Sequence, residues 1–172
     1  MEKRIKLRPL EETDLHFLYE VENEEDLWHL SDRQQGFSKK ILLEYIQNAD
    51  RSIYEAGQLR LGIELISTHE LLGFVDLYDF DPRNRKAGVG IIIYNKLDRN
   101  KGYGKEVLER IISYAFKKLF LHQLFAEIAI DNFPSIRLFE KAGFIQTGIK
   151  KDWIFNGDAF TDVFFYQLIN ES

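Results

Sequence analysis

The most constraining feature of the sequence is an apolar strand pattern that leads into a glycine-bearing loop and then into a helical pattern. Residues 87–94 are almost all apolar, which predicts a strand buried on both faces. A polar loop over residues 95–104 follows, and apolar residues then recur at helical spacing over residues 105–120. A second mostly apolar strand pattern covers residues 123–130. Two strands joined through a helix run parallel in one sheet, so this unit predicts an α/β fold.

The remaining patterns add strands and helices on both sides of this unit. Residues 4–9 predict a strand, and Thr13 with Asp14 offers an N-cap for a helix that extends to about Asn23. Residues 24–60 are polar with one further helical pattern, and this segment either covers an acceptor pocket or only shields the sheet. The other expected elements are a hairpin of strands 61–65 and 72–78, a helix over 131–142 with Gly143 as its C-cap, and a last hairpin around Asn156, Gly157 and Asp158.

Composition and charge restrict the class of protein. The chain has 172 residues, 45% of them hydrophobic, which is enough for one core, and we expect a single domain over residues 1–172. It has no cysteine, which excludes disulfides, thiolate zinc sites and an acyl-cysteine intermediate. The net charge of -5 argues against nucleic-acid and membrane binding and suits a cationic substrate.

Two further absences shape the expectations about location and metals. No signal-peptide pattern opens the chain and no run of about 20 apolar residues occurs, so we expect a cytoplasmic protein. The four histidines fall in different predicted elements and none pairs with another at metal-site spacing, so no metal is expected.

The glycine-bearing loop has the character of an anion site. Backbone N–H groups converge at the start of a helix, where the helix dipole favours negative charge. Glycines let the backbone approach a phosphate, and two basic residues add positive charge. The loop lacks both the Walker pattern and the dinucleotide-binding Gly-x-Gly-x-x-Gly pattern. The residues concerned are Arg99, Asn100, Lys101, Gly102, Tyr103 and Gly104.

Two motifs together resemble the GNAT superfamily of N-acetyltransferases. Arg99-x-x-Gly102-x-Gly104 after an apolar strand is similar to its coenzyme A loop, and the segment from Asn132 to Phe144 is similar to its second motif, an Asn opening a helix that closes on Gly-Phe. The resemblance covers nearly the whole chain and is strongest to the branch with ribosomal-protein N-terminal acetyltransferases and spermidine acetyltransferases. It implies a central, mixed, twisted sheet of about seven strands with helices on both faces.

The implied activity is acetyl transfer from acetyl-CoA to a primary amine, in a ternary complex and without a metal. The amine is either a small molecule, such as the polyamine spermidine, or a protein N-terminus of the ribosomal type. A non-catalytic acetyl-CoA-binding module is a third reading. A homodimer is the default expectation for such an enzyme.

The resemblance also assigns roles to individual residues. Ile92, Ile93 and Tyr94 would present the strand edge that pairs with the pantetheine arm, and residues 99–104 would wrap the pyrophosphate. Asn132 would contact the pantetheine arm, a helix N-cap being its alternative or simultaneous role. Ser135 would help the thiolate leave, although it could also be a plain first-turn residue.

The expected general base is Glu127, because it interrupts a strand that should be buried on both faces, where its pKa would rise toward a useful value. The structural alternative is a glutamate that reaches solvent or pairs with a lysine. The sequence departs from the superfamily pattern at two positions. Phe139 replaces the tyrosine that usually serves as acid, and Gly88 stands where this branch often carries a glutamate. The usual acid and a water-relayed base at these positions are therefore absent.

Overall fold

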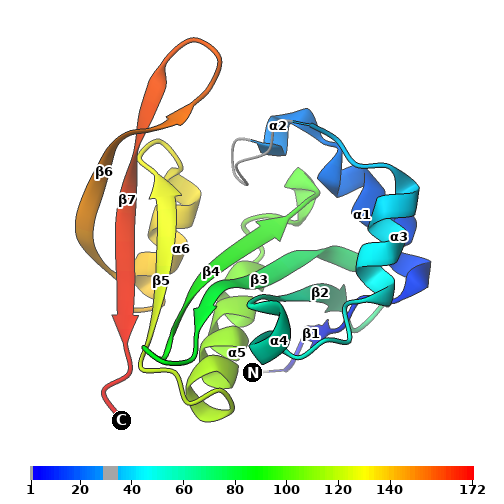
Figure 1. Ribbon diagram of the computed structural model, residues 1–172, viewed down its shortest axis with the longest axis horizontal. Coiled ribbons are helices and arrows are strands. Elements are labelled where there is room, and N and C mark those ends of the chain that lie inside the picture. The colour runs from blue at the N-terminus through cyan, green and yellow to red at the C-terminus, as the bar shows by residue number, and fades with distance from the viewer. Residues whose placement is uncertain (1, 29–34) are drawn as a thin grey trace.

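The computed structural model describes residues 2–28 and 35–172. It contains one seven-stranded mixed sheet in the order β1-β2-β3-β4-β5-β7-β6, so the predicted α/β fold and strand number are confirmed (Figure 1). The strands are β1 (Ile5–Arg8), β2 (Leu59–Leu65), β3 (Leu71–Asp81), β4 (Lys86–Ile93), β5 (Gln123–Ala129), β6 (Ile145–Phe155) and β7 (Phe160–Ile169). The α-helices are α1 (Leu15–Glu22), α2 (Glu25–Trp28), α3 (Lys39–Gln47), α4 (Ile53–Ala56), α5 (Tyr103–Lys117) and α6 (Phe133–Lys141), with short 3-10 turns η1 (Glu12–Asp14) and η2 (Lys96–Asp98).

The predicted parallel crossover is the pair β4 and β5, joined through α5. The two strands are in register only from Lys86 opposite Gln123 to Gly88 opposite Phe125. Beyond these residues they diverge, and the sheet opens into two halves (Figure 1). Residues 90–93 of β4 are therefore half-buried, whereas Ala87 to Val89 are buried as the apolar pattern predicts.

Helices cover both faces of the sheet, and the alternation of side chains along β3 shows how. Val75 and Leu77 point to the larger core, which α5 and α6 close with Val107, Leu108 and Phe139 among others. Phe74 points to the opposite face, where it packs with Leu18 of α1 and Leu42 of α3. One face therefore carries the long crossover helix, and the other carries the N-terminal helices.

Predicted and observed helix starts differ by two residues at α5 and at α6, which begins at Phe133, whereas α1 begins directly after Asp14 as predicted. Helix α5 begins at Tyr103 rather than at residue 105, because Gly102 takes a left-handed conformation (φ 84°) and caps it. Asp14 occupies the N-cap position of α1 as predicted, but its carboxylate makes no capping hydrogen bond to that helix and accepts from the Arg8 guanidinium at 2.8 and 3.0 Å. An ion pair with β1 thus takes the place of the side-chain contact that usually accompanies an N-cap.

The later turns agree with the sequence patterns. The C-cap of α6 is Ala142 rather than the predicted Gly143, and Gly143 follows it with φ 96°, the left-handed conformation that commonly ends a helix one residue beyond the cap. Asn156 and Gly157 make the hairpin between β6 and β7, which the Asn156 side chain supports by accepting from the N–H groups of Asp158 and Ala159. No helix in the described part of the chain is long and apolar enough to cross a membrane.

Candidate active site

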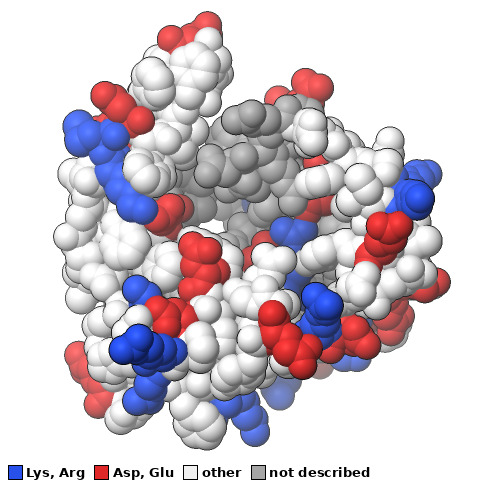
Figure 2. All heavy atoms as spheres, viewed as in Figure 1, with Lys and Arg blue, Asp and Glu red and all other residues white. Residues whose placement is uncertain are grey.

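A cleft of about 590 Å³ lies where β4 and β5 part. Its two sides are residues 89–92 of β4 and residues 126–129 of β5. Figure 2 shows both acidic and basic atoms beside the hollow in the middle of this face, between the half that carries β5, β6 and β7 and the half that carries α1 and α3. Because β4 has lost β5 as a neighbour here, its backbone N–H and C=O groups along this edge are open to a ligand.

Helix α6 brings three motif residues to one side of this cleft: Asn132, Ser135 and Phe139. The Asn132 side chain accepts a hydrogen bond from the backbone N–H of Ser135 at 3.3 Å, which starts the helix at this point. Phe139 is buried and meets Phe144 edge to face at 5.0 Å. Four of the predicted site residues therefore line the same cleft: Ile92, Glu127, Asn132 and Ser135. Phe139 also lines it but has no hydroxyl group that could donate a proton.

Glu127 is exposed, so its predicted burial is wrong. The neighbouring side chains of Ala126 and Ile128 point into the core, whereas Glu127 alternates to the opposite face, which lies open once β4 has turned away. There its carboxylate pairs with the Lys150 ammonium, which also sits 4.5 Å from the centre of the Trp153 ring. The glutamate nevertheless lines the cleft.

Sequence patterns did not reveal a cluster of charged residues on the α1 side of the cleft. The Arg60 guanidinium donates to both Asp76 carboxylate oxygens, at 2.7 and 2.9 Å, and also binds the Glu22 carboxylate. Burial alone would lower the pKa of Arg60, but the Asp76 carboxylate outweighs it and raises that pKa. The sequence feature that could have indicated this cluster was Asp76, an aspartate within the otherwise apolar strand pattern 72–78.

The charge of the cleft is acidic on balance. Its described lining contains four carboxylates and one guanidinium: Glu22, Asp76, Asp79, Glu127 and Arg60. An acceptor with positive charge is therefore favoured over an anionic one.

The predicted anion loop has a backbone suited to phosphate. Asn100 and Gly102 both have positive φ (61° and 84°), and the loop ends at the N-terminus of the 15-residue helix α5. The first N–H groups of a helix have no acceptor within it and favour an anion. Arg4, which sequence reasoning missed, stabilises the loop by donating to the Lys101 carbonyl at 2.9 Å and by lying 4.8 Å from the centre of the Tyr103 ring.

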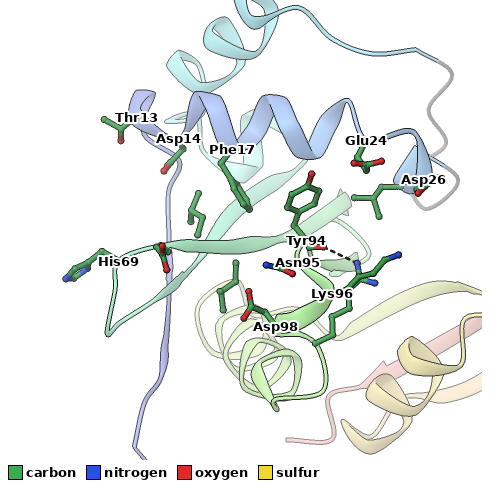
Figure 3. A pocket seen from close by; sticks show the side chains of 15 residues that line it. Thr13, Asp14, Phe17, Glu24, Asp26, His69, Tyr94, Asn95, Lys96 and Asp98 are labelled. Atoms are coloured by element: carbon green, nitrogen blue, oxygen red, sulfur yellow. Dashed lines mark hydrogen bonds between the residues drawn. The ribbon is translucent and has the colours of Figure 1, made fainter.

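The basic side chains of the loop have partners within it. Arg99 donates to the carbonyls of Ile93 (2.9 Å) and Tyr94 (3.3 Å), and Lys101 pairs with Asp98 at 3.0 Å. Arg99 and Tyr94 line a second cleft of about 780 Å³, between α1, α2 and the end of β4 (Figure 3). The structure therefore places them next to the β4–β5 cleft rather than inside it.

A further glycine of the loop serves packing. A Cβ atom on Gly104 would come within 3.1 Å of a Leu138 methyl group, so the glycine lets α5 approach α6 closely. Together, the open β4 edge and the α5 N-terminus fit two adjoining parts of coenzyme A, the pantetheine arm with its amide groups and the pyrophosphate. In the described residues, His, Asp and Glu side chains form no cluster of three that could hold a metal ion.

A sheet split between two parallel strands, with a helix N-terminus at the open end, is the architecture of acyltransferases that use acetyl-CoA. The family model described as an acetyltransferase (GNAT) domain matches residues 4–145. The chain therefore belongs to the GNAT acetyltransferase family, and it is an acetyl-CoA-dependent N-acetyltransferase.

Individual relatives agree with this assignment. Spermidine N(1)-acetyltransferase of Vibrio cholerae is 26% identical over 165 residues, which cover 95% of this chain and 91% of that protein. The Bacillus subtilis protein YdaF, provisionally named a ribosomal N-acetyltransferase, is 30% identical over 72% of this chain and 63% of its own length. The crystal structure of the Vibrio cholerae spermidine N-acetyltransferase in complex with CoA and spermine superposes with a TM-score of 0.86 at 24% identity, covering 98% of this chain and 96% of the other.

Proposed function

We propose that the acceptor is a small cationic amine, such as a polyamine, that enters the β4–β5 cleft from its acidic side. The observation that carries this proposal is the excess of carboxylates in the cleft lining, four against one guanidinium. The net charge of -5 and the similarity to a Vibrio cholerae spermidine N(1)-acetyltransferase support it. Electrostatic attraction would raise the local concentration of a cation at the cleft mouth.

Within this cleft we assign Glu127 as the final acceptor of the amine proton and Ser135 as the group beside the departing sulfur. Glu127 supports this role by lining the cleft while reaching solvent, so a proton can leave through it. Ser135 stands on the α6 side, next to Phe139, which has no hydroxyl. Residues 92–94 of β4, residues 99–104 of the loop and Asn132 would hold the coenzyme, and the functional unit would be one domain over residues 1–172.

The alternative acceptor is a protein N-terminus of the ribosomal type. The similarity to YdaF favours it, and so does the exposed aromatic side chain of Trp153 at the cleft, which offers a surface for a peptide.

We also propose that the enzyme acts in the cytoplasm as a homodimer, without nucleic-acid or membrane partners. Support for self-association comes from strand β6, an edge strand whose apolar side chains Ile145 and Ile149 are 69% and 53% exposed. The negative net charge of the chain argues against nucleic acids and anionic membranes as partners.

The decisive experiment measures free thiol released from acetyl-CoA with polyamines, amino acids and N-terminal peptides as acceptors. We expect turnover with polyamines to exceed turnover with peptides by at least tenfold, and Glu127→Gln to lower kcat by about 100-fold. The matched control is Glu109→Gln, an exposed glutamate on α5 that pairs with Lys105 away from the cleft. Turnover with peptides but not with polyamines would indicate a protein N-terminal acetyltransferase instead. Equal rates for Glu127→Gln and wild type would show that Glu127 does not accept the proton.

A further inference from the structure

The Lys150 ammonium of β6 lies among three groups that each attract a cation. It pairs with the Glu127 carboxylate, and it sits 4.5 Å from the centre of the Trp153 ring and 5.5 Å from the centre of the Phe165 ring. A cation within about 6 Å of an aromatic ring centre is attracted by the electron-rich face of the ring. Glu127, Trp153 and Phe165 therefore form a site for an aliphatic ammonium, which we call the ammonium cage.

Strand register brings two members of the cage together. Glu127 of β5 lies opposite Phe165 of β7, and Phe165 lies opposite Gly148 of β6 on its other side. Lys150 is two residues beyond Gly148, so its side chain is on the same face of the sheet. The Glu127–Lys150 ion pair therefore crosses β7 above Phe165. The Phe125 ring stacks on Phe165 with centroids 5.5 Å apart and holds that ring in place.

Trp153 joins the cage because β6 bulges. In a regular strand, residues three apart point to opposite faces of the sheet, which would place Trp153 away from Lys150. The register of β6 against β7 shifts between Lys150 and Ile154. Within this bulge Asp152 has a left-handed backbone (φ 48°), and its N–H donates to the Asp162 carboxylate at 2.8 Å. The bulge turns the Trp153 ring back over the Lys150 ammonium.

The cage opens into the β4–β5 cleft. Glu127 and Trp153 both line this cleft, whereas Lys150 reaches them from β6 and is absent from the described lining. The side chains of Lys150 and Glu127 are 32% and 29% exposed. An ion pair with this much exposure contributes little to stability, so its partners can separate at low cost. A second ammonium that enters through the cleft can therefore compete with Lys150 for the cage.

We propose that the ammonium of the acceptor amine displaces the Lys150 ammonium from the cage, so that Lys150 fills the acceptor site of the free enzyme. This inference rests on the proposed binding of a small cationic amine in the β4–β5 cleft. The exchange leaves the charge within the cage unchanged. It also places the acceptor nitrogen, instead of Lys150, against the Glu127 carboxylate that is proposed to take its proton. An uncharged acceptor cannot make this exchange, because it would leave Glu127 without a cation.

The first test measures the Kd of spermidine by calorimetric titration of the enzyme saturated with coenzyme A, which permits no turnover. If Lys150 fills the cage for about nine-tenths of the time, Lys150→Met should lower this Kd about tenfold. Trp153→Leu should raise the Kd about fivefold through the lost cation–π contact, and Trp153→Phe, which keeps an aromatic face, should restore much of the affinity.

Lys151→Met is the matched control for the first test. It removes the same charge from the adjacent residue, whose ammonium pairs with Asp162 outside the cage and whose side chain is 75% exposed. We expect its Kd for spermidine to equal that of wild type. If Lys150→Met and Lys151→Met changed the Kd equally, the effect would be one of net charge and the displacement would be overturned.

The second test follows Lys150 itself. An amine-reactive label modifies accessible lysine nitrogens, and mass spectrometry gives the ratio of label on Lys150 to label on Lys151. Spermidine also consumes the reagent, but this affects both lysines equally. We expect saturating spermidine to raise the ratio about tenfold, because it expels Lys150 from the cage. A constant or falling ratio would contradict displacement.

These measurements separate the inference from the proposed function. Polyamine turnover by the wild type, together with a spermidine Kd that neither Lys150→Met nor Trp153→Leu changes, would refute the cage alone. A wild type that neither binds nor acetylates spermidine would refute the proposed function, and the inference with it.

Discussion

At the scale of the residue, Asn132 combines a structural contact with a place in the cleft. Its side-chain oxygen accepts from the Ser135 N–H at 3.3 Å, and the residue also lines the space between β4 and β5. Ser38 makes the equivalent cap at the start of α3, accepting from the Ile41 N–H at 3.3 Å. Both caps accept from the N–H three residues on at the same distance, and only Asn132 is proposed to touch the coenzyme.

This pair allows a test that separates capping from coenzyme binding. Asn132→Ala and Ser38→Ala should each lower the free energy of unfolding by about 1 kcal/mol, as cap removal usually does. Asn132→Ala should in addition weaken acetyl-CoA binding about tenfold, corresponding to one lost hydrogen bond of about 1.4 kcal/mol. Calorimetric titration with acetyl-CoA gives the Kd, and an equal Kd for both variants would reduce Asn132 to a helix cap.

At the scale of the element, Glu106 attaches α5 to the first strand. Its carboxylate accepts from the backbone N–H groups of Arg4 (3.1 Å) and Ile5 (3.3 Å) and from the Arg110 guanidinium (3.1 Å). Partial burial would raise the pKa of Glu106, but the Ile5 N–H, Arg110 and the Arg4 N–H outweigh it and lower that pKa below 4.5. The helix that begins at the coenzyme loop is thereby fixed to β1.

A folded-state pKa below the unfolded value stabilises the protein above the unfolded pKa, and this stabilisation is lost as the pH falls through the folded pKa. We expect Glu106→Gln to lower the free energy of unfolding by about 1 kcal/mol at pH 7. Below pH 4.5 the difference from wild type should shrink. Urea unfolding at several pH values measures it, with Glu109→Gln as the exposed control on the same helix. If the free energies of unfolding of wild type and Glu106→Gln changed in parallel with pH, the lowered pKa of Glu106 would be contradicted.

At the scale of the whole molecule, the split sheet leaves β6 as an outer edge with apolar side chains in solvent. Such an edge is a ready surface for pairing with a second copy. Light scattering on the purified enzyme should give the mass of a dimer or larger assembly, and Ile149→Glu should shift it toward the monomer. Ile66→Glu, an exposed isoleucine in the turn after β2, should leave the mass unchanged. A monomeric wild type would contradict the predicted homodimer.

Much of this architecture follows from local patterns in the sequence. The apolar run 87–94, the glycines of the loop and the helical spacing after them predict the crossover, because side-chain periodicity and backbone freedom are properties of neighbouring residues. The hairpin at Asn156 and Gly157 and the helix end at Gly143 are predictable for the same reason. The motif residues around the cleft could be named from the sequence, although their roles stay predictions.

The contacts that only the tertiary structure decided join residues far apart in the chain. Arg4 stabilises a loop about a hundred residues away, and Arg60 joins Glu22 to Asp76. The exposure of Glu127 depends on where β4 separates from β5. The sequence of either strand alone does not predict that point of separation. The position of Trp153 over Lys150 likewise depends on the register shift of β6 against β7. Sequence periodicity determined which elements form, whereas strand register and divergence determined which side chains share the cleft, because these depend on the packing of distant segments.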